Sequence, residues 1–368
     1  MSKKVLSLLG LIIVVFLWGI APVISKYLFD NNFYSPALLV AVRGLLSCVA
    51  MFFIILFTGG FKEISKSFWV CIPIGLVVSG CFILTIALNS SLVNVIRGLA
   101  TMLLLVCFLL LLGKNKTEIK KSYWICIPAG LILGAAYLFQ FIGLETTTPA
   151  KNTFLESLSC VAVPICMFIL VREKPSFASI AAALACVFGS FVLCGQGWDF
   201  TAMFIAPTLG DILSSIGGIF FGIDIAFTKV FAKNRNSWLY VFFQLLILTI
   251  MSFAYALPFE HNLYFSCKWT HLLILLFIGI VCTAICWVLR TICIKSVSAV
   301  TCSVLMPMSA VIATITSIIF RMESFSWNVI VGGIIITLSI ILSGVYDAKV
   351  EKKQKEKELS NNESNQSI

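Results

Sequence analysis

The chain has 368 residues, of which 60% are hydrophobic and only 11% are charged, and its formal net charge is +10. Soluble globular proteins are about 45–50% apolar and about 25% charged, so this composition excludes an ordinary soluble protein. The positive charge does not indicate nucleic-acid binding, because the basic residues lie mostly in short links between apolar stretches and in the C-terminal tail.

Apolar stretches bounded by charged or turn residues divide most of the chain, and each is near the ~20 residues that a helix needs to cross a bilayer. The first one follows Lys3 and Lys4; it is too long for a signal peptide and lacks an A-x-A cleavage site, so we expect it to be a span. In chain order the sequence predicts twelve helices, over 5–29, 36–58, 68–88, 92–112, 123–144, 150–171, 177–195, 208–231, 237–257, 271–294, 298–320 and 326–346.

Charge in the links predicts the orientation of these helices. One set of alternate links, with the two ends, carries eighteen lysines and arginines, whereas the other set carries three, Lys151, Lys268 and Arg321. Cytoplasmic links of membrane proteins are enriched in such residues, so both termini are expected in the cytoplasm. The polar segment 347–368 is predicted to be a disordered basic tail there.

A short segment is written twice. KEISKSFWVCIPIGL at 62–76 and TEIKKSYWICIPAGL at 117–131 agree at ten of fifteen positions, and VRGL at 42–45 is answered by IRGL at 96–99. Each copy reads as a helical hairpin of about 55 residues. The pattern indicates a tandem duplication that added one hairpin, at about 60–113, without changing the orientation of later helices.

A second, more distant repeat relates the two halves. WGIAPVISK at 18–26 matches FGIDIAFTK at 221–229, and REKPSF at 172–177 matches RMESFS at 321–326. In the predicted orientation the two members of each pair lie on opposite sides of the membrane. Inverted repeats of this kind form many secondary transporters, with the substrate site between the halves.

These motifs resemble the drug/metabolite transporter superfamily, EamA type. The first half is similar through Trp18, Gly19, Lys26, Arg43 and the segment GLETTTPAKNTFLESL, and the second through Gly210-Asp211, Gly222, Lys229 and Leu305-Met306-Pro307. The resemblance implies an all-α polytopic membrane protein with two inverted five-helix repeats, the ten-span fold, to which the extra hairpin adds two spans. The repeats are expected at 1–195 and 208–346.

The resemblance also implies a secondary transporter that moves a small organic metabolite or amino-acid-like solute across the cell membrane by alternating access, as an exporter. Two alternatives stay open: a non-transporting membrane scaffold or sensor, and an intramembrane enzyme. The expected partners are the small-molecule substrate and the lipid bilayer, without nucleic acid, and a homodimer is left open.

Charged and polar side chains inside apolar spans are costly in a bilayer and therefore mark functional sites or structural pairs. Glu156 and Asp224 are the carboxylates placed most clearly within spans, and they either titrate or pair to fix the packing of helices. The candidate residues for the substrate cavity or for coupling are Trp18, Lys26, Arg43, Tyr137, Gln140, Glu156, Asp224, Lys229, Gln244 and Arg290.

Some candidates carry a competing interpretation. Lys26 and Lys229 lie near helix ends, where lysine often anchors a helix at the interface instead of binding substrate. Arg43 and Arg97 are duplicates, so only one of them can hold the family's position.

The sequence predicts no cofactor, metal or catalytic residue. Thirteen of the fourteen cysteines lie in apolar stretches, where cysteine behaves as a small hydrophobic residue. There are two histidines, and no motif for ATP hydrolysis or for zinc or serine hydrolases occurs.

Overall fold

The computed structural model describes residues 3–57, 125–172, 177–194, 208–259 and 265–342. Within these residues every element is helical, apart from one isolated bridge between Tyr34 and Phe265. The predicted helices over 68–88 and 92–112, the extra hairpin and the tail lie outside the described residues.

The first half begins with two long helices, α1 (Lys3–Asp30) and α2 (Pro36–Phe57). After the part that is not described, α6 (Cys126–Thr146) is followed by α7 (Pro149–Glu156), α8 (Ser159–Val171) and α9 (Phe177–Cys194). The predicted helix over 150–171 is therefore interrupted at two residues, 157 and 158.

The second half repeats this order. It contains α11 (Leu209–Phe231) and α12 (Ser237–Phe259), then a long span made of α13 (Trp269–Leu276), the π-helical stretch η3 (Phe277–Ile285) and α14 (Cys286–Ser296). The next span is again interrupted, into α15 (Ala299–Leu305) and α16 (Met308–Ile319), and a last helix covers Trp327–Leu342.

Eight of the described helices, counting interrupted ones as single spans, are long and apolar enough to cross a membrane, and two shorter apolar helices cover Ile180–Leu193 and Trp327–Leu342. The chain is therefore an all-α, multi-pass membrane protein. The predicted total of twelve spans stays a prediction.

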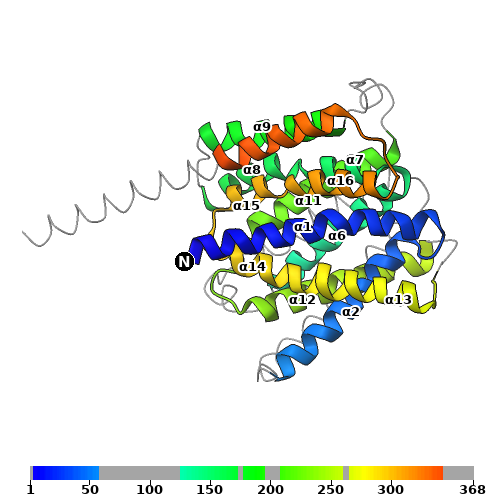
Figure 1. Cartoon of the computed structure of the whole chain (residues 1–368). Coiled ribbons are helices and arrows are strands. Elements are labelled where there is room, and N and C mark those ends of the chain that lie inside the picture. Colours follow the sequence, from blue (N-terminus) through cyan, green and yellow to red (C-terminus); the bar gives the residue numbers. More distant parts are fainter. Residues whose placement is uncertain (1–2, 58–124, 173–176, 195–207, 260–264, 343–368) are drawn as a thin grey trace, which may run out of the picture.

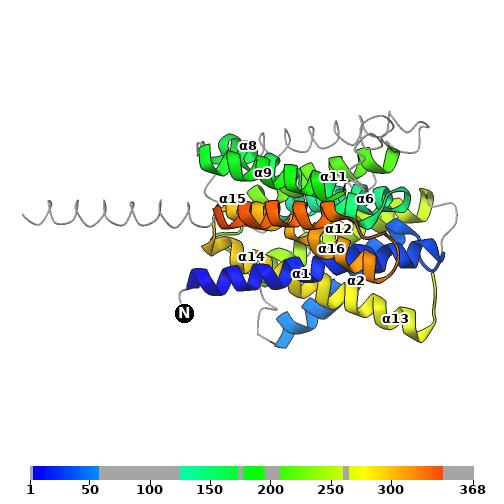
Figure 2. The same cartoon turned by 45° about the horizontal axis from the view of Figure 1, so that its top comes forward.

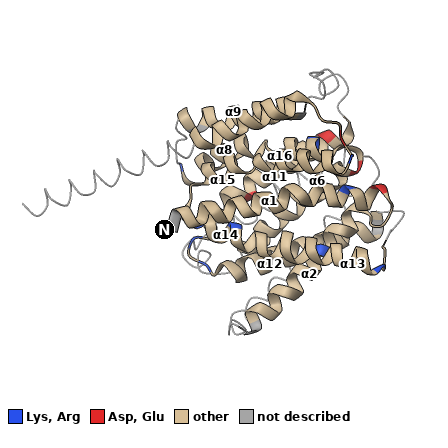
Figure 3. Cartoon of the chain, in the orientation of Figure 1, with Lys and Arg blue, Asp and Glu red and all other residues tan. Residues whose placement is uncertain are grey.

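The helices form one elongated bundle in which segments of the two halves interleave (Figures 1 and 2). Helix α11 packs on α6 and α8 of the first half, α12 packs on α2, and α1 packs on α14 and α16 of the second half. Charged residues are sparse along the bundle and gather toward its two ends (Figure 3), as expected for a chain whose middle lies in hydrocarbon.

The first helix of each half packs closely against the interrupted span of the other half. A Cβ atom on Gly19 of α1 would lie 2.8 Å from the Ser309 carbonyl oxygen, and one on Gly222 of α11 would lie 2.9 Å from the Ser159 carbonyl oxygen. Small residues allow this approach of backbones in membrane proteins. The aromatic-glycine motifs at 18–19 and 221–222 thus occupy equivalent places.

The interruption at Pro307 has a clear chemical cause and remedy. Proline lacks the N–H that would bond the carbonyl of Ser303 four residues earlier. That carbonyl oxygen accepts from the Met306 backbone N–H at 3.3 Å, and the Cys160 thiol of α8 also approaches it, with an S–O distance of 2.8 Å. A freed backbone carbonyl is tolerated at membrane depth where protein covers it, and here the other half supplies the cover.

Candidate functional site

A small central cavity lies between the two halves of the chain. Its volume is about 30 Å³, roughly the space of one water molecule. Helices α1, α2, α6, α7, α11 and α14 contribute its lining, which consists of Trp18, Ala21, Pro22, Arg43, Tyr137, Gln140, Phe141, Glu156, Phe221 and Trp287. The cavity combines a cation, a carboxyl group, an amide and five aromatic rings.

The cation of the cavity is Arg43, on α2, which is 2% exposed. Its Nε donates to the Thr283 hydroxyl at 2.9 Å, and its Nη2 lies 3.5 Å from the Tyr137 hydroxyl oxygen. Its guanidinium carbon is 4.8 Å from the centre of the Tyr137 ring, an arrangement that stabilises a cation. No carboxylate among the described residues forms an ion pair with Arg43.

Thr283 belongs to η3, and this π-helical stretch shapes the site. Short π-helical stretches within α-helices occur often at functional sites. Here the Cys282 carbonyl of η3 accepts a hydrogen bond from the Trp18 indole N–H at 2.8 Å. The stretch thereby holds one charged and one aromatic residue of the cavity.

The carboxyl group of the cavity is Glu156, the last residue of α7, directly before the interruption of its span. Gln140 of α6 donates to its Oε2 at 2.8 Å. Glu156 is partly exposed toward the cavity, whereas Gln140 is buried. Like Arg43, Glu156 has a neutral hydrogen-bond partner and no ion pair among the described residues.

The aromatic wall of the cavity includes residues that the sequence did not single out. The indole N–H of Trp287 donates to the Tyr137 hydroxyl oxygen at 2.7 Å, and its ring centre is 5.0 Å from that of Trp18. Phe221 lies edge-on to Tyr137 at 5.3 Å between ring centres. Phe221 opens the repeat motif FGIDIAFTK, whereas Trp287 and Phe141 carried no signal in the sequence, because an aromatic residue in an apolar span is usually part of the packing.

Three further candidates form a cluster outside the cavity lining. Asp224 of α11 and Arg290 of α14 are an ion pair with an N–O distance of 2.9 Å, and both are fully buried. Gln244 of α12 donates to the Asp224 Oδ1 at 2.6 Å.

The two candidate lysines cap helix ends. Lys26 donates to the Glu145 carbonyl oxygen at 2.7 Å, near the end of α6, and Lys229 donates to the Ile294 and Val297 carbonyl oxygens at 2.8 and 2.6 Å, at the end of α14. Cations at helix C-termini satisfy unpaired carbonyl groups and the helix dipole. This geometry favours an anchoring role over substrate contact.

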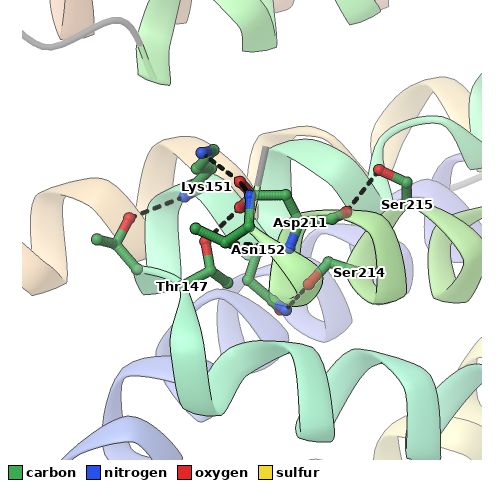
Figure 4. A network of polar contacts seen from close by, with 8 residues as sticks. Thr147, Lys151, Asn152, Asp211, Ser214 and Ser215 are labelled. Atoms are coloured by element: carbon green, nitrogen blue, oxygen red, sulfur yellow. Dashed lines mark hydrogen bonds and ion pairs between the residues drawn. The ribbon is translucent and has the colours of Figure 1, made fainter. Parts of the chain in front are cut away.

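A polar network, which we call the latch, joins the two halves at one end of the bundle (Figure 4). Lys151 of α7 and Asp211 of α11 form an ion pair at 2.6 Å, and Thr147 donates to the same carboxylate at 2.9 Å. One turn further in, Asn152 donates to the Ser214 hydroxyl at 2.8 Å. Asp211 also forms a capping box with Thr208, so the latch is tied to the start of α11.

The start of α7 is also held by Glu323, which lies after α16. Its Oε1 accepts from the Ala150 backbone N–H at 3.4 Å. Burial raises the pKa of the Glu323 carboxyl above its ordinary value, and hydrogen bonds from Thr148 and from the Ala150 N–H oppose that rise.

The structure thus divides the ten candidates into three groups. Five of them line the cavity: Trp18, Arg43, Tyr137, Gln140 and Glu156. Three form the ion-pair cluster next to it: Asp224, Gln244 and Arg290. The last two, Lys26 and Lys229, cap helix ends. In the part of the chain that the structure describes, no group of three or more His, Cys, Asp or Glu side chains could hold a metal ion.

The fold and the site together define a multi-pass membrane protein with a small enclosed cavity between its two halves. A model of the EamA-like transporter family matches residues 86–195 and 208–345, and the chain belongs to this family of the drug/metabolite transporter superfamily. Its members are transporters and not enzymes.

Individual proteins similar to this chain include a transporter and a solved structure. An uncharacterized transporter of Archaeoglobus fulgidus is 26% identical over 128 residues, which are 34% of this chain and 39% of that protein, so less than half of its length is matched. A crystal structure of another protein has the same fold, with a TM-score of 0.60 and 14% identity, and covers 94% of this chain and 99% of that one.

The family match bears on the duplicated hairpin. Its first segment begins at residue 86 and includes IRGL at 96–99, in the second copy, whereas the described residues place VRGL at 42–45 of the first copy in the bundle.

Proposed function

We propose that this protein is a secondary transporter that carries a small zwitterionic metabolite, such as an amino-acid-like solute, out of the cell by alternating access. The observation that supports this most is that one cavity is lined by a cationic and an acidic side chain, Arg43 on α2 and Glu156 on α7. Each has only neutral hydrogen-bond partners among the described residues. A carboxylate and an ammonium group on one solute would satisfy both.

Burying a charge against neutral partners is costly in a bilayer unless a ligand or water compensates it. A solute with a negative group beside Arg43 and a positive group beside Glu156 removes that cost when it binds. The aromatic rings of the wall, Trp18, Tyr137 and Trp287 among them, would contact the rest of the solute.

The size of the cavity supports alternating access. At about 30 Å³ it cannot hold a metabolite, so the helices around it must move apart for a solute to bind. The latch joins the two halves by side-chain contacts that can break and re-form, and the interruption of the span at 157–158 offers a hinge beside Glu156. We propose that the latch closes the outer end of the protein.

We propose the following architecture around this site. Residues 1–195 and 208–346 form two inverted five-helix repeats, the hairpin at about 60–113 raises the total to twelve spans, and residues 347–368 are a cytoplasmic tail. The charge bias of the links supports cytoplasmic termini in the cell membrane. The equivalent contacts of Gly19 and Gly222, and of Lys26 and Lys229, support the repeat relation.

The proposal is tested by flux measurements in proteoliposomes. Purified protein is reconstituted and offered a panel of radiolabelled zwitterions, organic cations and organic anions, with and without a proton gradient. We expect zwitterions to move, and we expect Glu156→Gln to slow their movement by at least about tenfold, the value of one charge-assisted hydrogen bond. Asp30→Asn, a carboxylate whose side chain is 53% exposed, is the matched control and should transport normally.

Failure of every solute to move under both conditions would overturn the proposal and favour a scaffold or sensor. Transport of cations or anions alone would contradict the proposal that the substrate is a zwitterion, but it would support the proposal that the protein is a transporter. Chemical conversion of a solute without its movement would point to an intramembrane enzyme.

A further inference from the structure

The ion pair of Asp224 and Arg290 lies behind the cavity wall. Both side chains are almost completely buried, at 0% and 1% exposed, and neither lines the cavity. Gln244 holds the Asp224 carboxylate from α12 at 2.6 Å, so three helices of the second half meet at this pair. A buried pair of this kind contributes little net stability, although it can fix how helices pack.

The guanidinium of Arg290 has an unusual set of neighbours. Its Nη2 contacts Asp224, whereas Nε and Nη1 have no hydrogen-bond acceptor among the described residues. The guanidinium carbon lies 4.5 Å from the centre of the Trp287 indole. The face of this indole therefore stabilises the charge of the guanidinium, on the side that Asp224 does not cover.

Trp287 carries this restraint to the cavity. Its indole N–H donates to the Tyr137 hydroxyl oxygen at 2.7 Å, and the same oxygen faces Arg43. The Trp287 side chain is therefore held by two contacts, the Arg290 guanidinium over its ring and the Tyr137 hydroxyl at its N–H. An uninterrupted chain of contacts runs from Asp224 through Arg290, Trp287 and Tyr137 to the charged side of the cavity.

We infer that Asp224 and Arg290 are positioning residues, which fix the Trp287 indole and through it the Tyr137 hydroxyl in the cavity wall. They do not themselves touch the solute. The inference rests on the proposed function only in treating this wall as the surface that contacts the solute; the positioning itself is a property of the protein without ligand.

The test is fluorine NMR of protein that carries 5-fluorotryptophan, recorded without any solute. Eight tryptophans give eight signals, and Trp287→Phe assigns the relevant one. The double variant Asp224→Leu with Arg290→Met removes both charges together and leaves no unpaired charge in the interior. We expect the Trp287 signal to shift or split by more than its line width, while the signals of the exposed Trp269 and Trp327 stay in place.

A second variant tests the inference independently if the double variant does not fold. Arg290→Lys keeps a cation opposite Asp224 and removes the planar guanidinium that lies on the indole, so the Trp287 signal should again move. An unchanged Trp287 signal in either folded variant would overturn the inference. Because no solute is present, this result stands apart from any failure to find transport, which would count only against the proposed function.

Discussion

Arg43 and Arg290, the most deeply buried arginines among the described residues, differ in what faces them. Arg290 has a carboxylate at 2.9 Å, fixed in turn by an amide from a third helix. Arg43 has a hydroxyl at 2.9 Å, a phenol at 3.5 Å and aromatic faces, and a cavity beside it. The protein itself supplies the opposite charge for Arg290, whereas for Arg43 we propose that a ligand supplies it. Burial alone therefore does not identify a binding residue; the identity of the partner does.

The largest effect expected from this difference is on stability. Arg290→Met strips the partner from a buried carboxylate, and such a change costs about 3–5 kcal/mol. Arg43→Met removes a cation whose hydrogen-bond partners are neutral and breaks no ion pair, so its cost should be nearer ~1–2 kcal/mol. Thermal unfolding in detergent measures both. Equal loss of stability in the two variants would mean that the two arginines are equivalent.

The next effect concerns the two ends of the bundle. Lys151→Met breaks the ion pair of the latch, which is partly exposed and so contributes about 0.5–1 kcal/mol. Hydrogen–deuterium exchange of residues 147–153 and 208–215 should become severalfold faster as the latch opens. Lys151→Arg should keep the slow exchange, and Lys268→Met, a change at another lysine near a helix start, should leave it unaffected. Slow exchange in Lys151→Met would show that the latch does not hold this end closed.

The smallest effect is a pH dependence at the same end. Because burial raises the pKa of Glu323, the folded state holds this proton more tightly than the unfolded state does. Its favourable contribution is complete below the ordinary glutamate range and is lost as the pH rises through the raised value. Glu323→Gln should therefore flatten the dependence of the unfolding temperature on pH across that interval. An unaltered pH profile in the variant would contradict the assignment.

The helices could be predicted closely from the sequence, because apolar length and bounding charge determine a span in a bilayer. The expected helix over 177–195 is Phe177–Cys194, and that over 208–231 is Leu209–Phe231. The interruption at 157–158 could not be predicted, because no proline or glycine marks it. Pro307 lies at the equivalent interruption, but Pro22 and Pro164 lie within continuous helices, so a proline in a span does not by itself predict one.

The site could be predicted in part. Trp18, Arg43, Tyr137, Gln140 and Glu156 stood out as polar or aromatic residues within spans, and the structure brings them together. The pairing of Asp224 with Arg290 and the place of Trp287 behind Tyr137 depend on contacts between helices distant in sequence. Periodicity and composition hold no information on such contacts.

The central claim is that Arg43 and Glu156 each hold one charge of the same solute, and competition measurements test it most directly. Uptake of a carried zwitterion is inhibited by that zwitterion, by its methyl ester and by its N-acetyl derivative. The wild type should prefer the free zwitterion over both derivatives by at least about tenfold, the value of one charge-assisted hydrogen bond. Arg43→Gln should lose the discrimination against the ester, and Glu156→Gln that against the N-acetyl compound. Wild-type discrimination in both variants would contradict the claim.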